Sequence, residues 1–214
     1  MNSKKKLIFF DLDGTLLNIE NRYLNLFNDF CKTYDINNIG QREFWKEKRE
    51  GKSNPEILIQ KGYEESVAYK FHENWVTSIE SNYWLGFDKL QPYAVELLES
   101  LKKKNVDMCL LTARNNRENL TQQLIKIDIN KYFKEIINVD TNDAVNQKRK
   151  YLETYLPEIF VGDSEFDYLA SKSLDIKFFC VTNGFRSHDF LKQKKVKKLF
   201  TELSSAGSEI LDSI

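Results

Sequence analysis

The 214-residue sequence is poor in the features that mark several classes of protein. Only three prolines and eight glycines are present, which excludes collagen-like and linker-rich chains. The 32 basic and 32 acidic side chains cancel, whereas a dedicated nucleic-acid-binding protein normally shows a basic excess. No apolar run approaches the length that crosses a bilayer. We therefore expect a globular protein that binds neither nucleic acid nor a membrane.

Cysteines are few and scattered. The three of them stand at positions 31, 109 and 180, without a Cys-x-x-Cys pair, and an odd number does not suggest a disulfide framework. The basic start is followed by an apolar run of only four residues, Leu7–Phe10, too short for a signal-peptide core. Both observations predict a cytoplasmic protein in a reducing compartment.

Short apolar runs alternate with helical patterns along most of the chain. The runs cover Leu7–Phe10, 106–111, 159–161 and 178–181, with a weaker one at 136–139. Runs that are apolar on both faces are typical of central strands in a parallel sheet. Apolar residues at helical spacing fill 92–104, 116–127, 148–156 and 165–174. The alternation predicts an α/β fold with a doubly wound parallel sheet.

The segment 17–87 has a different pattern. It contains no convincing strand, and apolar residues recur there at helical spacing, as in the series Val67, Phe71, Trp75 and Ile79. We therefore predict an all-helical insert at 17–87 in a core built from 1–16 and 88–214. A chain of this length fits one domain with an insert.

Carboxylates follow two of the predicted strands. Asp11 and Asp13 come directly after the first, and Asp163 and Asp167 follow the run 159–161. Ligands of open α/β sheets bind outside the carboxyl ends of the strands, so these acids converge if the two strands are neighbours. Such a cluster needs a cation, and a set of oxygen ligands suits Mg²⁺.

Other strand ends carry groups that complement the acids. Thr112, Ala113 and Arg114 follow the run 106–111, and Lys148 stands at the start of a predicted helix. A hydroxyl, exposed turn amides, one lysine and a metal are what a phosphate dianion needs. Each of these residues alone would be unremarkable, but the ordered set favours a phosphate site.

The set resembles the four motifs of the haloacid dehalogenase-like hydrolase superfamily. The matching residues are Asp11-Leu12-Asp13-Gly14-Thr15, Thr112, Lys148 and Gly162-Asp163-x-x-x-Asp167. The helical insert resembles the cap of that family, and the tail 181–186 looks like that of phosphoglycolate-phosphatase-like members. Lys150 is an alternative to Lys148, because it lies two residues further along the same predicted helix.

The resemblance implies a Rossmann-like core and a mechanism. Asp11 would be the nucleophile that forms an aspartyl-phosphate. Asp13 would exchange protons with the leaving group and with water. The Mg²⁺ ligands would be Asp11, the main-chain carbonyl of Asp13, Asp163 and Asp167, while Thr112 and Lys148 would hold the phosphate oxygens. Ala113 and Arg114 would also bind the substrate, a small phosphorylated metabolite.

Several alternatives remain open. Asp13 favours phosphoryl transfer over dehalogenation, because a halide leaves without a proton, but a phosphomutase uses the same acid. A receiver-type signalling module also clusters acids and a lysine around Mg²⁺, and a non-catalytic phosphate-binding regulatory protein could share the fold. The chain lacks both Gly-x-x-x-x-Gly-Lys and Gly-x-Gly-x-x-Gly, which disfavours those nucleotide-binding folds. A monomer and a homodimer are equally compatible with the sequence.

A loop inside the helical insert is the predicted specificity element. Gly51 permits a tight turn in the segment 49–54, and the resemblance places this loop over the active site. Arg49 and Lys52 would bind a carboxylate or a second anionic group of the substrate. His72, beside Phe71, is expected to have a packing or surface role only.

Overall fold

The computed structural model describes residues 5–214 and contains a six-stranded parallel sheet. The strand order is β5-β4-β1-β6-β7-β8. The strands are β1 (Leu7–Phe10), β4 (Asp107–Ala113), β5 (Glu135–Val139), β6 (Ile159–Gly162), β7 (Lys177–Val181) and β8 (Leu199–Phe200). All five predicted strands are present, and β1 lies directly beside β6. The two acid-bearing strands are therefore neighbours.

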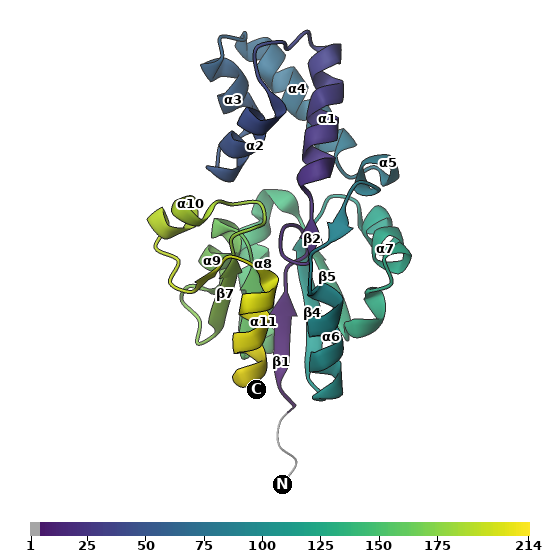
Figure 1. Cartoon of the computed structure of the whole chain (residues 1–214), viewed down its shortest axis with the longest axis vertical. Helices are drawn as coiled ribbons and strands as arrows, with labels where there is room; N and C mark the ends of the chain where they lie inside the picture. Colours follow the sequence, from purple (N-terminus) through teal and green to yellow (C-terminus); the bar gives the residue numbers. More distant parts are fainter. Residues whose placement is uncertain (1–4) are drawn as a thin grey trace.

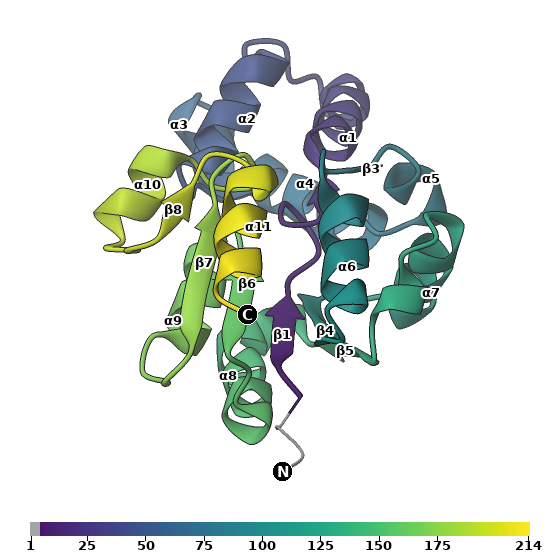
Figure 2. The ribbon, with the colours of Figure 1, turned by 60° about the horizontal axis from the view of Figure 1, so that its bottom comes forward.

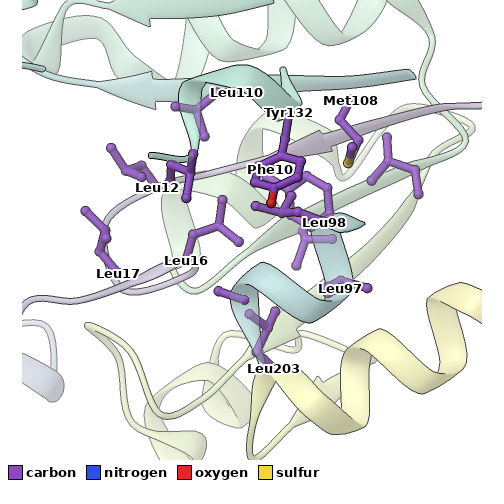
Figure 3. Packing of buried hydrophobic residues seen from close by; sticks show 14 of the residues in the cluster. Phe10, Leu12, Leu16, Leu17, Leu97, Leu98, Met108, Leu110, Tyr132 and Leu203 are labelled. Carbon is purple, nitrogen blue, oxygen red and sulfur yellow. The ribbon is translucent and has the colours of Figure 1, made fainter. Parts of the chain in front are cut away.

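Helices cover both faces of the sheet, which confirms the doubly wound α/β fold. Figure 2 shows α6 (Ala94–Lys103) and α11 (Leu203–Asp212) in front of it, with α8 (Ala144–Tyr155) and α9 (Glu165–Ser171) behind. Successive residues of β1 point to opposite faces. Phe10 packs with Leu97, Leu98 and Leu203 (Figure 3), whereas Phe9 packs with Leu152. None of the helices between residues 5 and 214 is long and apolar enough to span a bilayer.

Several helix boundaries differ from the sequence patterns; α9, predicted over 165–174, ends at Ser171. In the segment 92–104 the helix begins only at Ala94, because Tyr93 adopts a left-handed conformation with φ of 71°. Helix α8 begins at Ala144 instead of Lys148, directly after a short 3₁₀ helix, η2 (Thr141–Asp143), that the Asp140 side chain caps. Lys148 therefore lies in the second turn of α8, with its side chain buried.

The segment 17–87 contains five helices that pack on one another beyond the carboxyl ends of the strands (Figure 1). They are α1 (Glu20–Thr33), α2 (Gln41–Arg49), α3 (Asn54–Gln60), α4 (Glu65–Ser78) and α5 (Asn82–Leu85). Phe27, Phe44, Phe71 and Trp75 form the centre of their own apolar cluster. We call these five helices the cap.

Two short strands connect the cap with the core. β2 (Leu17–Asn18) and β3 (Lys89–Leu90) pair in antiparallel fashion at the two ends of the predicted insert. They were not predicted, because two residues are too few to show a strand pattern. The remaining elements are α7 (Arg117–Lys126), η1 (Asn130–Tyr132) and α10 (His188–Gln193).

Candidate active site

Three buried carboxylates meet where β1 and β6 end. Asp11 follows β1, and its N–H donates to the carbonyl of Val161 on β6 (2.8 Å). Asp163 follows β6, and Asp167 lies in the first turn of α9. One oxygen from each carboxylate lies within 4.8 Å of the other two. The chain thus gathers these predicted ligands at one point.

Lys148 reaches this cluster from α8. Its Nζ donates to Oδ1 of Asp11 (2.7 Å) and to Oδ1 of Asp167 (2.6 Å). The two carboxylates outweigh the cost of burial and raise the pKa of Lys148, so the ammonium stays charged. Lys150 is exposed. Of the two candidate lysines, the fold brings only Lys148 to the acids.

One ammonium does not balance three carboxylates. Burial raises the pKa of Asp11 to about 7, with the Asp167 carboxylate adding to the rise and Lys148 opposing it. Burial, Asp11 and Asp167 raise the pKa of Asp163 well above its ordinary value. Two negative charges are therefore poorly compensated, and oxygen ligands at this spacing suit a divalent cation. Asp11, Asp163 and Asp167 could hold one.

Asp13 faces away from this cluster toward two arginines. Its carboxylate accepts from Arg114 (2.5 Å) and lies 3.0 Å from a guanidinium nitrogen of Arg22 in α1. Although burial opposes it, the two guanidiniums hold the pKa of Asp13 below its ordinary value. The contact with Arg22 could not be predicted, because the two residues lie in different predicted segments and share no local pattern.

The three residues at the end of β4 that were predicted to bind phosphate, Thr112, Ala113 and Arg114, differ in what they contact. Thr112 and Ala113 line a cavity of about 470 Å³ together with Asp11 and Lys148. The N–H of Arg114 is engaged, since it donates to Oδ1 of Asn138 (3.0 Å). Residues 141–146, which form η2 and the first turn of α8, also line this cavity. They could not be predicted as part of the site, because they carry no motif.

Two glycines allow the loop after β7 to close around Asp163. The N–H of Phe185 donates to Oδ2 of Asp163 (2.5 Å). A Cβ on Gly184 would lie 2.3 Å from that oxygen and 2.3 Å from the carbonyl oxygen of Gly14. Gly14 itself has φ of 83°. Only a residue without a side chain fits between the first motif and this carboxylate.

We expect Gly184→Ala to lower the free energy of unfolding by roughly 1–3 kcal/mol, because overpacking at a rigid contact displaces main chain. Gly40→Ala is the matched control, since a Cβ there meets no atom within 4 Å. Urea unfolding of both variants measures the difference. Equal stability of the two variants would show that the loop around Asp163 shifts to accommodate the Cβ without a measurable cost in the free energy of unfolding.

The predicted specificity residues lie elsewhere than expected. Lys52 pairs with Glu47 and donates to Oε1 of Gln60 (2.8 Å). Arg49 donates to the main-chain carbonyls of Thr182 and Arg186 in the core loop. Neither residue lines the cavity at Asp11. In this arrangement both side chains contact groups of the protein itself, and their contact with a substrate stays a prediction.

Arg49 belongs to a cap–core junction formed by the end of α2 and the loop 182–187. Arg186 donates to the carbonyl of Lys48 (2.8 Å) and pairs with Glu165 (2.7 Å). The Ser187 N–H donates to the carbonyl of Arg49 (3.0 Å), and its hydroxyl donates to Glu50 (2.7 Å). The junction fixes the cap against the same loop that holds Asp163.

A model of the haloacid dehalogenase-like hydrolase family matches residues 8–181. Three solved structures are similar to the chain. A predicted phosphatase from Clostridium acetobutylicum has 19% sequence identity and a TM-score of 0.72, and the match covers 98% of this chain and 100% of that one. A predicted phosphoglycolate phosphatase from Haemophilus somnus has 18% identity and a TM-score of 0.67 (96% and 98% covered), and a haloacid dehalogenase-like hydrolase from Streptococcus pneumoniae has 19% identity and a TM-score of 0.70 (96% and 98% covered). No curated protein matches the sequence. At these identities the likeness shows the shared fold.

Proposed function

Because the chain belongs to the haloacid dehalogenase-like hydrolase family, we propose that it is a phosphatase that hydrolyses a small phosphomonoester through an aspartyl-phosphate on Asp11. The observation that carries the proposal is the position of Asp11. Its carboxylate lies at the end of a central strand, bonds to Lys148 (2.7 Å) and borders a cavity of about 470 Å³. A nucleophile beside a fixed cation, on a cavity large enough for a small phosphate ester, suits in-line attack on phosphorus.

The cofactor we propose is Mg²⁺, held by Asp11, Asp163, Asp167 and the main-chain carbonyl of Asp13. The support is the uncompensated negative charge of the three buried carboxylates and their all-oxygen character. Bound Mg²⁺ would neutralise the carboxylates and the phosphate, which otherwise repel each other.

The residues around Asp11 then have distinct roles. Asp11 attacks the phosphorus, and water hydrolyses the resulting acyl phosphate in a second step. Lys148 and the hydroxyl of Thr112 bind the equatorial oxygens as charge shifts among them. Both side chains are buried, so their positions are fixed before the substrate binds.

Asp13 serves both steps as proton donor and then acceptor. The guanidiniums of Arg22 and Arg114 favour its carboxylate form, which is the form that accepts a proton from water. For the first step it must hold a proton, and a phosphate dianion nearby raises the pKa of a carboxyl group. Substrate binding therefore prepares Asp13 as the acid, and loss of the leaving group restores the base.

We further propose a cytoplasmic protein that acts on a small phosphorylated metabolite, as a monomer or a homodimer. The cytoplasmic assignment is supported by three free cysteines, two of them buried. The small substrate is supported by the size of the cavity and by the cap that stands over the strand ends.

The test is an assay of released phosphate with 2-phosphoglycolate, hexose phosphates, nucleoside monophosphates and para-nitrophenyl phosphate. We expect turnover of at least one of them with Mg²⁺ and none after chelation, with recovery when Mg²⁺ is returned. Interconversion of a sugar phosphate without phosphate release would identify a phosphomutase instead. Binding of phosphate esters without any reaction would identify a regulatory protein.

A further inference from the structure

A second cavity lies on the cap side of Asp13. It has a volume of about 350 Å³ and shares Asp13, Tyr23 and Ala113 with the cavity at Asp11. Cap residues from α1, α2, α3 and α4 form its far side. Since Asp13 is the proposed proton donor to the leaving group, a leaving group on this side of Asp13 would occupy this space.

Lys48 brings an unneutralised charge to this cavity. The residue is only 9% exposed, and its ammonium has neither a hydrogen-bond acceptor nor a carboxylate partner among residues 5–214. Burial and the neighbouring Arg186 lower its pKa to about 7. Glu56 opposes this shift but is engaged by the N–H and hydroxyl of Ser53 (both 2.7 Å). An ammonium on a largely buried side chain, with the Phe185 ring (5.9 Å) as its neighbour and no carboxylate partner, is stabilised when an anion binds to it.

The other acids of the cavity do not compensate Lys48. Both oxygens of Glu80 accept main-chain hydrogen bonds, from Asn115 (3.1 Å) and Asn116 (2.8 Å). Asp13 is engaged by Arg22 and Arg114. The acids that line this cavity are thus occupied, and a bound anion would supply the counter-charge that Lys48 lacks.

Two side chains of this cavity other than its arginines also have a buried polar atom without a hydrogen-bond partner. Oδ1 of Asn54 and Nδ1 of His72 are buried without a hydrogen bond in the described chain, and Asn54 is only 2% exposed. Tyr23 and Trp75 add aromatic surface. The combination of one cation without a carboxylate partner, these two polar atoms and an apolar wall is that of a binding site for a small polar molecule.

We propose that Lys48, Asn54 and His72 bind the leaving group, and that the physiological substrate carries a second anionic group, a carboxylate or a phosphoryl group, on the alcohol that is released. This inference rests on the proposed phosphatase function. It assigns to Lys48 the anion contact that the sequence suggested for Arg49 and Lys52. Arg49 already donates to two main-chain carbonyls and Lys52 pairs with Glu47, and neither of the two lines this cavity.

The experiment compares three short phosphomonoesters in the presence of Mg²⁺. 2-Phosphoglycolate carries a carboxylate, ethylene glycol bisphosphate carries a second phosphoryl group, and ethyl phosphate carries neither. We expect kcat/KM of the wild-type protein for at least one anionic substrate to exceed that for ethyl phosphate about tenfold or more. Which of the two is preferred identifies the anion.

Lys48→Met removes the charge and keeps the length of the side chain. We expect it to lower the ratio of anionic to uncharged kcat/KM about tenfold or more, mainly through KM, because a uniform binding interaction is lost. Lys46→Met is the matched control on the exposed part of α2 and should keep the wild-type ratio. Lys48→Gln provides a second variant in case the first fails to fold.

The outcomes separate the two proposals. Phosphate release with equal kcat/KM for all three substrates, or an unchanged ratio in both Lys48 variants, would overturn the leaving-group site and leave the phosphatase function intact. No release from any substrate by the wild-type protein would overturn the phosphatase function itself. In that case, Mg²⁺-dependent binding of 2-phosphoglycolate that Lys48→Met abolishes would still support an anion site at Lys48.

Discussion

We expect Asp11→Asn to lower kcat by roughly 10⁴-fold or more, because the amide cannot attack phosphorus and cannot form the acyl phosphate. The protein should nevertheless fold normally. Burial raises the pKa of Asp11 to about 7, so its charge is unfavourable in the folded state. A carboxyl group with a raised pKa stabilises the fold at low pH and loses that contribution as the pH rises through the folded pKa. At pH 8 without metal, Asp11→Asn should therefore be as stable as the wild-type protein or more stable.

Two measurements check this expectation: phosphate release under saturating substrate, and thermal unfolding at pH 8 with and without Mg²⁺. Asp29→Asn is the control, since it makes the same chemical change at an exposed position of α1. A near-normal kcat of Asp11→Asn would rule out the covalent mechanism through Asp11. A loss of activity accompanied by a much lower Tm would mean that Asp11 is required for folding.

The second large effect is expected for Lys148→Met. Removing the ammonium leaves Asp11 and Asp167 buried together without the hydrogen bonds of 2.7 and 2.6 Å that now join them. Breaking a buried ion pair on one side costs about 3–5 kcal/mol. Activity should fall along with stability, because Lys148 also binds the transferring phosphoryl group in the proposed mechanism.

The stability defect of Lys148→Met should depend on pH. Without the ammonium, which opposes the rise, the pKa of Asp11 rises further in the folded state. Groups with raised pKa values destabilise the fold as the pH increases, so the defect should be larger at pH 8 than at pH 5.5. Urea unfolding at both pH values measures it, and Mg²⁺ should restore part of the loss by replacing the missing positive charge.

Lys150→Met is the control for this variant, because Lys150 lies two residues away on the exposed side of α8. It should keep both activity and stability. If Lys150→Met were the inactive variant and Lys148→Met were active, the assignment of the phosphate-binding lysine would have to be exchanged.

The acids at the strand ends could be predicted because their positions follow from the sheet alone. Strands that are apolar on both faces appear in the sequence as short continuous apolar runs. Residues at the carboxyl ends of neighbouring parallel strands must converge. The family and the doubly wound fold inferred from these motifs are confirmed. The start of α8 was placed too late, because η2 and the first turn of α8 carry few apolar residues.

The cap side of the site could not be predicted in the same way. Lys48, Asn54 and His72 come from three different helices, and whether each faces the cavity depends on how these helices pack. Lys48 and Lys52 look alike in the sequence. Only the fold distinguishes the buried, unpaired lysine from the one that pairs with Glu47. The ionic contacts of Asp13 with Arg22 and Arg114 are likewise long-range and carry no local pattern.

The junction between α2 and the loop 182–187 sets how the cap can move during turnover. Any opening of the cap on this side has to break the hydrogen bonds of Arg49, Arg186 and Ser187, while the paired strands β2 and β3 can act as the pivot. The loop that would be pulled carries Phe185, whose N–H holds Asp163. If the cap opens to release product, as the proposed function requires, this loop would move with it, and the hold on the proposed metal ligand Asp163 would loosen as the pocket empties.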